Sequence, residues 1–410
     1  MRNATYRQAA ILVGGLGTRL GEATRATPKP MVAVGGRPFL AWLLRELCRF
    51  GVEEVVLLAG HLSDTLRQGV AAIAETLPRP LRLVCSDEPV RAGTGGALFH
   101  ASHLLDARFI LCNGDSWFDG NLAAALAAAA ADPDEVVARM IVRQVPDAAR
   151  YGVVSLDGAV VRGFAERGDA GGGAINTGIY LLDRRVLDTL APVCSLEREV
   201  LPALAARGLV RATRGEGHFI DIGIPEDLAR AQHEIPRTLR RGALFLDRDG
   251  TINIDHGWVG SRDRFEWIAG AQQAIAAATA AGLHVFVVTN QSGVARGRYD
   301  EAAVQALHGW MAEMVRRAGG TIDDIRYAPH HPDFGPPAPA HRADWRKPGA
   351  GMLHDLIRRW EVDPARSLLV GDQPSDIAAA TAAGIAGHRF PGGDLAAFIA
   401  PLLPPGGPRS

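Results

Sequence analysis

The stretch Leu244-Phe-Leu-Asp-Arg-Asp-Gly-Thr-Ile-Asn253 decides the fold of the second half of this chain. A run of apolar, strand-forming residues delivers two carboxylates, Asp247 and Asp249, to its C-terminal end, and Gly250 then turns the chain away. Open α/β sheets carry their chemistry at the carboxyl ends of their strands. Carboxylates two residues apart can hold a hard cation together while one attacks phosphorus, so the spacing suits an aspartyl-phosphate mechanism. An isolated Asp-x-Asp is more often a strand that ends in a polar turn.

Three further motifs follow Asp249 in the chain order that suits an aspartyl-phosphate mechanism. Thr289 and Asn290 end a second apolar strand, Lys347 stands in Arg-Lys-Pro, and Asp372 ends another strand. Together they resemble the haloacid-dehalogenase phosphatase superfamily over residues 243 to about 391. The strings Asp-Arg-Asp-Gly-Thr-Ile-Asn and Thr-Asn-Gln-Ser-Gly-Val-Ala-Arg-Gly are most similar to its heptose-bisphosphate and histidinol-phosphate phosphatase branch.

This resemblance implies a role for each residue. Asp247 would attack the phosphate, and Asp249 would protonate the leaving alcohol and later activate water. Mg²⁺ would be held by Asp247, Asp372 and the main-chain carbonyl of Asp249. Arg346 is placed to meet another anionic or hydroxylated part of the substrate. The phosphate-binding and substrate-binding positions are Thr289, Asn290, Arg346 and Lys347.

A glycine-rich turn follows a short apolar strand near the start of the chain. Glycines let backbone N–H groups approach phosphates closely, and Arg19 and Lys29 supply cations to the same place. Gly-Gly-Leu-Gly-Thr-Arg-Leu with Pro-Lys-Pro resembles the sugar-1-phosphate nucleotidyltransferases over about residues 8 to 232, although Glu22 stands where proline is usual. The resemblance implies that pyrophosphate leaves toward Gly15, Arg19 and Lys29. The nucleotide-binding positions predicted here are Gly14, Gly15, Gly17 and Thr18.

Two aspartates and a second glycine turn extend this resemblance. Gly93-Thr94-Gly95 opens a helix where the family holds the nucleotide. Asp115 ends a buried strand, and Asp221 recurs in Phe-Ile-Asp-Ile-Gly-Ile-Pro. Each could be an ordinary helix cap or turn, but the resemblance favours two magnesium-binding aspartates.

The residues between these aspartates resemble a sugar pocket. Gly152, Glu166 and Asn176 match positions that contact the sugar in the related enzymes, and Arg167 stands where lysine is usual. Either cation could bind the 1-phosphate of the sugar, but with different geometry. Glu166 alone could equally be part of a solvated turn.

Composition excludes several classes of partner. Forty-four basic and 45 acidic side chains are mixed along the chain, which suggests neither nucleic acid nor an anionic membrane surface. The expected partners are small-molecule substrates, a nucleoside triphosphate and sugar phosphates, and a homo-oligomer is compatible with the sequence. The cysteines, Cys48, Cys85, Cys112 and Cys194, lack metal-ligand spacing. Reduced, buried thiols and the absence of a signal or membrane-spanning stretch predict a cytoplasmic protein.

At 410 residues, the chain is expected to form two α/β domains. The prediction is a Rossmann-like nucleotidyltransferase domain of the glycosyltransferase-A type with a mixed sheet, residues 1–235, and a phosphatase domain with a parallel sheet, residues 236–410. Residues 233–242 would be a short junction. Fewer than sixty residues separate successive phosphatase motifs, so no cap domain fits. The Pro-Gly-rich residues 404–410 are expected to be disordered.

A loop that carries zinc in many members of the phosphatase branch has changed in this chain. The resemblance places the usual cysteine ligands at Ala328, Ala343 and Trp345, and only His330 remains. One imidazole cannot hold structural zinc, which takes about four N or S ligands, so zinc is not expected. His331 and His341 could rebuild such a site only in principle. The loop is expected to pack through Trp345, Phe334 and its prolines.

Two activities on one chain should serve one pathway. A sugar with phosphates at both ends could be the substrate of the phosphatase at one end and, after that step, of the nucleotidyltransferase at the other. The two resemblances imply a bifunctional enzyme that removes the 7-phosphate of heptose 1,7-bisphosphate and then transfers a nucleotidyl group, expected to be GMP from GTP, to heptose 1-phosphate. One alternative is a histidinol-phosphate phosphatase fused to a hexose-1-phosphate nucleotidyltransferase. Another is a regulator that binds a sugar nucleotide without turnover.

Overall fold

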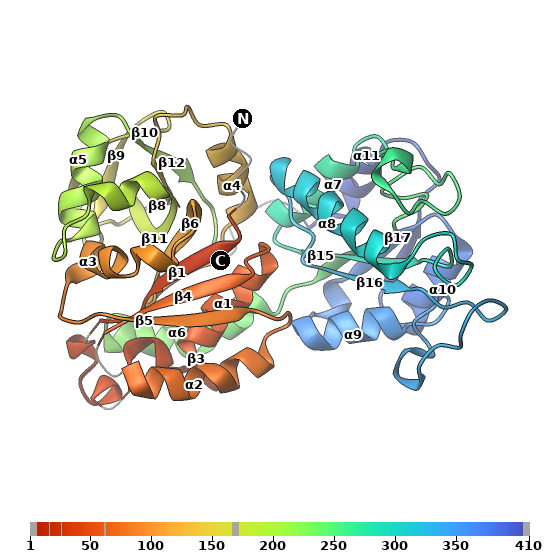
Figure 1. Cartoon of the computed structure of the whole chain (residues 1–410), viewed down its shortest axis with the longest axis horizontal. Coiled ribbons are helices and arrows are strands. Elements are labelled where there is room, and N and C mark those ends of the chain that lie inside the picture. The colour runs from red at the N-terminus through yellow and green to blue at the C-terminus, as the bar shows by residue number, and fades with distance from the viewer. Residues whose placement is uncertain (1–5, 16, 26, 61–62, 166–171, 405–410) are drawn as a thin grey trace. The chain divides into compact units, whose positions relative to one another are not determined.

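The computed structural model describes residues 6–15, 17–25, 27–60, 63–165 and 172–404. Contacts separate them into two compact units, one that ends at Leu239 and one that begins at Arg240. Each unit has its own apolar core and is described by itself (Figure 1). Among the described residues, no helix is long and apolar enough to cross a membrane. Glu166, Arg167 and the predicted disordered tail from residue 405 lie outside the described residues.

The first unit is built on a mixed nine-stranded sheet, as predicted. Its strand order is β5-β4-β1-β6-β11-β8-β12-β10-β9. The strands from β5 to β6 are parallel, whereas β11 runs antiparallel to both of its neighbours. The bounds are β1 (Gln8–Leu12), β4 (Glu54–Ala59), β5 (Arg82–Asp87), β6 (Arg108–Asn113), β8 (Ala138–Val145), β9 (Val153–Asp157), β10 (Val160–Ala165), β11 (Gly173–Asp183) and β12 (Val210–Arg214).

Helices cover both faces of this sheet. The interior strand β1 is apolar after Gln8, as a strand covered on both faces should be, and Ala9, Ala10 and Ile11 are fully buried. Figure 1 shows α1, α2 and α6 on one side of β4 and β5, and α3 on the other. The helices are α1 (Phe39–Arg49), α2 (Ser63–Thr76), α3 (Gly93–His100), α4 (Leu122–Ala130), α5 (Leu201–Ala206) and α6 (Pro225–Leu239), and two small antiparallel pairs join β2 (Ala33–Val34) to β3 (Arg37–Pro38) and β7 (Ser116–Phe118) to β13 (Phe219–Asp221).

The second unit is built on one parallel sheet of five strands, in the order β16-β15-β14-β17-β18. The chain fills one half of the sheet first and then crosses to the other side of β14, so the strand order reverses there. Ligands of open α/β sheets bind outside the carboxyl ends of the strands at such a reversal. The bounds are β14 (Ala243–Leu246), β15 (His284–Asn290), β16 (Asp324–Ala328), β17 (Leu368–Gly371) and β18 (Ala386–Arg389).

Five α-helices pack around this sheet. Helix α8 buries Val304, Leu307 and Met311, and the Asp300 side chain caps it by accepting a hydrogen bond from the Ala303 N–H. Residues 240–404 form one compact unit around this sheet, so no separate cap domain stands apart from it in this described part of the chain, as the motif spacing predicted. The helices are α7 (Ala271–Ala280), α8 (Glu301–Arg317), α9 (Gly351–Trp360), α10 (Pro374–Ala382) and α11 (Leu395–Ile399).

The prediction of a non-helical junction at residues 233–242 was wrong for residues 233–239, because α6 continues to Leu239 with Pro236 inside it. The Pro236 ring lies against Gly35, where an added Cβ would come within 2.2 Å of it. Gln232 bonds both the N–H of Gly35 and the carbonyl of Ala33, at 2.9 and 2.8 Å. These tertiary contacts hold a helix that its proline would otherwise tend to end. Only residues 240–242 connect α6 to β14, and the predicted boundary at 235/236 falls within the helix.

Candidate active sites

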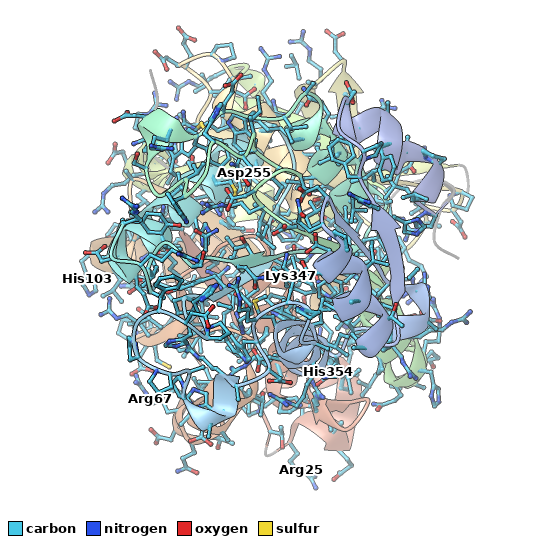
Figure 2. The ribbon with its side chains drawn as sticks, turned by 90° about the vertical axis from the view of Figure 1, so that its right-hand side faces the viewer. Arg25, Arg67, His103, Asp255, Lys347 and His354 are labelled. Atoms are coloured by element: carbon cyan, nitrogen blue, oxygen red, sulfur yellow. The ribbon has the colours of Figure 1, made fainter. Side chains whose placement is uncertain are left out.

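Asp247 leaves the end of β14 and meets a buried ammonium group. Lys347 Nζ lies 2.8 Å from Asp247 Oδ1 and 2.6 Å from Asp376 Oδ1, and it donates a hydrogen bond to the Val288 carbonyl at 2.9 Å. Asp247, Lys347 and Asp376 are 7%, 4% and 0% exposed. Figure 2 marks Lys347 among the densely packed side chains near the middle of its view. The sequence therefore joins a lysine and two aspartates from three separate segments into one buried charge cluster.

Burial governs the protonation of this cluster. It raises the pKa of Asp247 to about 7, although Lys347 acts in the opposite direction. For Lys347, burial by itself would lower the pKa, but Asp247 and Asp376 together raise it. The ammonium group thus stays charged, and it favours the ionised form of the carboxylate that attack on phosphorus requires.

Asp249 is held by a buried arginine and by two side-chain amides. Its carboxylate accepts hydrogen bonds from Arg248 Nη2 at 2.8 Å, Gln291 Nε2 at 2.9 Å and Asn253 Nδ2 at 3.0 Å. Arg248 is fully buried, and its Nη1 lies 3.2 Å from His308 Nε2. Since a guanidinium only donates, His308 Nε2 must be the acceptor. Burial, followed by the Arg248 charge, lowers the pKa of His308 to about 3.

We expect His308→Gln to weaken the acid sensitivity of folding. The unfolded chain protonates this imidazole below about pH 6.5, whereas the folded chain does so only near pH 3, so wild-type stability falls as the pH drops through that window. Between pH 7.5 and pH 5, His308 should lower the free energy of unfolding of the wild type by about 2 kcal/mol. Urea unfolding at both pH values measures it. His354→Gln, at an exposed position of α9, is the control, and equal pH dependence of wild type and His308→Gln would contradict the expectation.

Three carboxylates gather beside this cluster and could hold a metal ion. Asp247, Asp372 and Asp376 each offer an oxygen within 4.8 Å of the others. Asp372 Oδ1 is buried without a hydrogen-bond partner among the described residues, and burial raises the pKa of its carboxyl. Gly250 has φ +83°, and a Cβ there would lie 2.6 Å from Asp372 Cγ, so the chain leaves room for that carboxylate. An oxygen-only donor set of this kind fits a hard cation such as Mg²⁺. The Asp249 side chain is outside this group.

Two of the predicted phosphate-binding residues, Asn290 and Thr289, form hydrogen bonds within the protein near this cluster. Asn290 donates to the Lys347 carbonyl and accepts from the Lys347 N–H, both at 3.0 Å, so its amide holds the backbone of the lysine. The Thr289 hydroxyl is 1% exposed and accepts a hydrogen bond from Gln291 at 2.9 Å. Arg346 lines a cavity formed by the loop between β16 and α9. In that loop Arg342 stacks on Trp345, which is half-buried. Phe334 lies under Arg296, from the segment after β15, but stays 41% exposed, so the expected packing of the loop through Phe334 is only partial.

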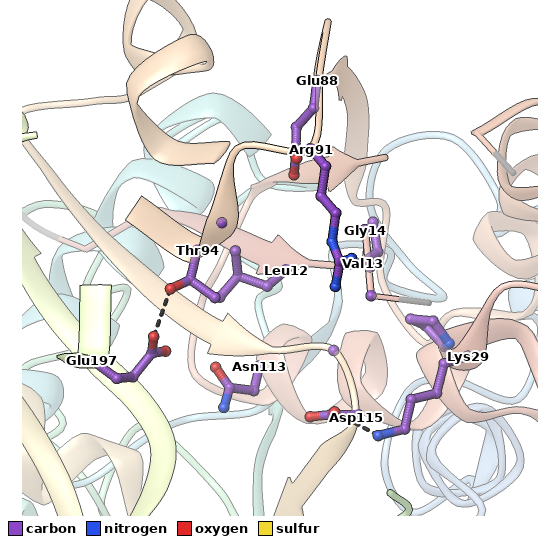
Figure 3. A pocket seen from close by; sticks show the side chains of 14 residues that line it. Leu12, Val13, Gly14, Lys29, Glu88, Arg91, Thr94, Asn113, Asp115 and Glu197 are labelled. Carbon is purple, nitrogen blue, oxygen red and sulfur yellow. Dashed lines mark hydrogen bonds and ion pairs between the residues drawn. The ribbon is translucent and has the colours of Figure 1, made fainter. Parts of the chain in front are cut away.

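In the first unit, both glycine turns line one cavity of about 290 Å³ (Figure 3). Gly14 and Gly15 come from the end of β1, Gly93 and Thr94 from the start of α3, and Asp115 from the end of β6. Gly93 has φ +75°, and a Cβ there would lie 2.6 Å from the Cys194 carbonyl oxygen. The cavity therefore lies at the carboxyl edge of the parallel strands. Where glycines form its wall, no side chain would keep a phosphate away from the backbone N–H groups. Gly95, Gly17 and Thr18 complete the two turns but do not line the cavity.

Lys29 joins the two predicted metal-binding aspartates. Its Nζ lies 2.6 Å from Asp115 Oδ2 and 3.7 Å from Asp221 Oδ1, and it is 6% exposed (Figure 3). Burial and the nearby Asp115 raise the pKa of Asp221, against the opposing effects of Lys29 and Arg19. Arg19 and Asp221 line a second cavity of about 290 Å³. The sequence-predicted cations and carboxylates therefore meet at one place, where their opposite charges balance.

Of the predicted sugar-contacting residues, the described part includes Gly152 and Asn176. Asn176 donates a hydrogen bond to the buried Tyr180 hydroxyl at 2.6 Å, and the Gly152 carbonyl accepts from the Asn176 N–H at 3.3 Å. Glu197, which lines the cavity at the glycine turns, accepts a hydrogen bond from the Thr94 hydroxyl at 2.5 Å. It also contributes to raising the pKa of Tyr180, after burial as the main cause.

Four residues of these sites were missed by sequence reasoning. Asp376 carried a local signal, since it stands three residues after Gln373 and closes a capping box at the start of α10. Gln291 was part of a quoted motif but had no role assigned. His308 had the spacing of an ordinary core position, and Glu197 lies 103 residues from Thr94, so nothing in the sequence pairs them.

Comparisons with known proteins match the two units of the chain to two different families. The nucleotidyl transferase family model matches residues 8–238, and a HAD-hydrolase-like model matches residues 344–389. A D-glycero-beta-D-manno-heptose-1,7-bisphosphate 7-phosphatase from Rhodopseudomonas palustris is 48% identical over 164 residues, which are 40% of this chain and 91% of the relative. The Escherichia coli K12 protein of the same name is 43% identical over 143 residues, 35% of this chain and 75% of the relative.

Among solved structures, HddC from Yersinia pseudotuberculosis is similar to the first unit. It is 30% identical and has a TM-score of 0.50, and the match covers 56% of this chain and 99% of HddC. The same values hold for HddC complexed with GMP-PN.

Proposed function

The chain belongs to the nucleotidyl transferase family through its first unit and to the heptose-bisphosphate phosphatase family through its second, and we propose from this premise that it is a bifunctional enzyme of nucleotide-activated heptose biosynthesis. The phosphatase would remove the 7-phosphate of D-glycero-D-manno-heptose 1,7-bisphosphate. The nucleotidyltransferase would couple the resulting heptose 1-phosphate to a nucleotide and release pyrophosphate. Each activity resides in one of the two units.

The buried cluster of Asp247, Lys347 and Asp376 carries the phosphatase proposal. A carboxylate oxygen of Asp247 attacks the phosphorus of the bound 7-phosphate, and the sugar leaves with a proton from Asp249 as its bond to phosphorus breaks. Asp249 then takes a proton from water, which cleaves the aspartyl phosphate at phosphorus. Lys347 balances the charge of the transferring phosphoryl group, and Asn290 fixes the lysine through its backbone. Asp247, Asp372 and the Asp249 carbonyl would hold Mg²⁺, which would supply further charge neutralisation.

Catalysis in the first unit rests on positioning and charge. The 1-phosphate oxygen of the sugar attacks the α-phosphorus of the triphosphate, and the bond to pyrophosphate breaks. The glycine turns admit the triphosphate to the backbone, and Arg19 and Lys29 stabilise the leaving pyrophosphate. Asp115 and Asp221 would hold Mg²⁺. Gly152 and Asn176 contact the sugar, together with Glu166 and Arg167.

We propose guanosine as the nucleoside. The support is the likeness of the first unit to HddC, whose solved complex contains GMP-PN, a guanine nucleotide. The complex makes GTP the first triphosphate to test, ahead of UTP and dTTP.

The test is a stepwise reaction followed by phosphate and pyrophosphate release. With heptose 1,7-bisphosphate and Mg²⁺ alone, we expect one equivalent of phosphate and an end point at heptose 1-phosphate. Adding GTP should yield GDP-heptose and pyrophosphate. Histidinol phosphate, fructose 1,6-bisphosphate and hexose 1-phosphates are the comparison substrates. If histidinol phosphate is the far better phosphatase substrate, or only a hexose 1-phosphate is activated, the single-pathway proposal is wrong.

A further inference from the structure

The Gln291 side chain connects Asp249 to a tyrosine that lies two residues before α8. Gln291 is 1% exposed, and its Nε2 donates hydrogen bonds to Asp249 Oδ2 and to the Thr289 hydroxyl, both at 2.9 Å. Its Oε1 accepts a hydrogen bond from the Tyr299 hydroxyl at 2.8 Å. Both polar atoms of this buried amide therefore have partners, and a chain of hydrogen bonds runs from Tyr299 through Gln291 to Asp249.

The partners of the Gln291 amide determine which way round it lies. An ionised carboxylate only accepts hydrogen bonds, so the NH₂ end of the amide must face Asp249. The Thr289 hydroxyl can donate or accept and would tolerate either orientation. The Tyr299 hydroxyl donates to Oε1 and so supports the orientation in which Nε2 meets the carboxylate. Without this donor, a buried carbonyl oxygen would lose its hydrogen bond, which costs free energy and favours rotation of the amide.

Two glycines make room for the Tyr299 ring. A Cβ added at Gly260 would lie 2.2 Å from Tyr299 Cδ1, and one added at Gly293 would lie 2.3 Å from Tyr299 Cζ. Side-chain carbons do not approach a ring that closely, so the ring keeps its place only beside glycine. Burial raises the pKa of Tyr299, although Arg248 acts in the opposite direction. The hydroxyl therefore keeps its proton at neutral pH and remains a donor in a fixed position.

The other partners of the Asp249 carboxylate belong to its own segment of the chain. Arg248 Nη2 lies 2.9 Å from Oδ1 and 2.8 Å from Oδ2, and Asn253 Nδ2 lies 3.0 Å from Oδ1. Gln291, which follows β15, is the contact that ties the carboxylate to the neighbouring strand. A general acid must lie within hydrogen-bond reach of the oxygen that it protonates, so a small rotation of the carboxylate lowers the rate.

We propose that Tyr299 is a positioning residue of the phosphatase, whose hydroxyl orients the Gln291 amide and thereby aims Asp249 at the oxygen of the leaving alcohol. This inference rests on the proposed phosphatase function and deepens it by two residues that need not touch the substrate. In the step concerned, the bond from phosphorus to the alcohol oxygen breaks and the proton of Asp249 goes to that oxygen. A phenol of low pKa leaves as its anion without this proton. The contribution of Tyr299 should therefore depend on the leaving group.

The test measures kcat/KM of Tyr299→Phe on two classes of phosphate ester, in the full-length protein with Mg²⁺. This ratio reports the steps up to the cleavage of the bond to the leaving group. For heptose 1,7-bisphosphate, an alkyl phosphate, we expect a loss of about 10- to 50-fold. For 4-nitrophenyl phosphate, which needs no proton on its leaving group, the loss should be about threefold or less. A merely structural role of the hydroxyl would lower both values equally.

Two further variants accompany this measurement. Gln291→Met keeps the length of the side chain without its hydrogen bonds and should show the same selective loss. Tyr327→Phe is the matched control, because the Tyr327 hydroxyl bonds Gln305 at 3.0 Å and Glu301 at 2.7 Å rather than Gln291. It should keep both values within about twofold of the wild type. Turnover of 4-nitrophenyl phosphate also shows that each variant is folded.

The outcomes separate this inference from the proposed substrate. Equal losses on the two ester classes, or no loss in Tyr299→Phe, overturn the role of Tyr299 and leave the proposed function intact. If heptose 1,7-bisphosphate is a poor substrate of the wild type, fructose 1,6-bisphosphate takes its place as the alkyl phosphate. A selective loss on that ester upholds the role of Tyr299 and rejects the heptose substrate. A wild type that cleaves neither class of ester rejects both proposals.

Discussion

Asp247→Asn is expected to lower phosphatase turnover by about 10⁴-fold or more while nucleotidyl transfer stays near the wild-type rate. The amide is almost isosteric with the carboxylate but cannot form the aspartyl phosphate, and it keeps the place of the side chain beside Lys347. The nucleotidyltransferase site is built from residues of the other unit, around Lys29 and Asp115. Phosphate release from the bisphosphate and pyrophosphate release from GTP, assayed on the same preparation, give the two rates.

Asp115→Asn is the reciprocal variant. It should abolish pyrophosphate release and leave phosphate release unchanged, because Asp115 pairs with Lys29 rather than with any residue of the second unit. A variant that silences both reactions, while its thermal unfolding remains that of the wild type, would show that the two sites do not act independently.

Lys347→Met should both inactivate the phosphatase and destabilise the second unit by about 3 to 5 kcal/mol. Methionine keeps most of the volume of the lysine but leaves Asp247 and Asp376 facing each other in the interior without a cation. The carboxyl groups would have to take up protons or remain charged, and both states cost free energy. Urea unfolding without added metal is the measurement, since a bound cation would partly replace the ammonium charge.

The control for this variant is Arg358→Met on α9. Arg358 is 75% exposed as a side chain and pairs with Asp355 at 2.9 Å, so removing its charge should change stability by less than about 1 kcal/mol. A loss of under about 1 kcal/mol for Lys347→Met as well would mean that the buried cluster contributes little to folding, and that its role is confined to chemistry.

The sequence predicts the place of a polar site residue well where that residue directly follows an apolar strand. Asp247, Asn290 and Asp372 each follow an apolar run, and parallel strands bring such ends to one edge whatever the intervening chain does. The phosphatase fold and the place of Asp247 at the end of β14 could therefore be predicted. The same holds for the glycine turn at Gly14, where a strand again meets a phosphate-binding pattern.

What could not be predicted depends on packing between distant segments. His308 sits on the buried face of α8 with the same spacing as its apolar neighbours, so only the structure reveals its contact with Arg248. Pro236 suggested the end of a helix, and contacts with Gly35 overrule that local preference. Asn290 was predicted as a phosphate ligand, and only the structure shows that its amide also holds the backbone of Lys347. Local pattern cannot tell which of two possible partners a side chain meets.

The glycine at position 250 sets a limit on directed evolution of the phosphatase. Its positive φ excludes most side chains on conformational grounds, and the Asp372 carboxylate fills the space that a methyl group would enter. A saturation library at this codon should consequently return glycine alone among active clones. Substitutions aimed at substrate range are better placed in the β16–α9 loop, whose side chains line a cavity of about 380 Å³.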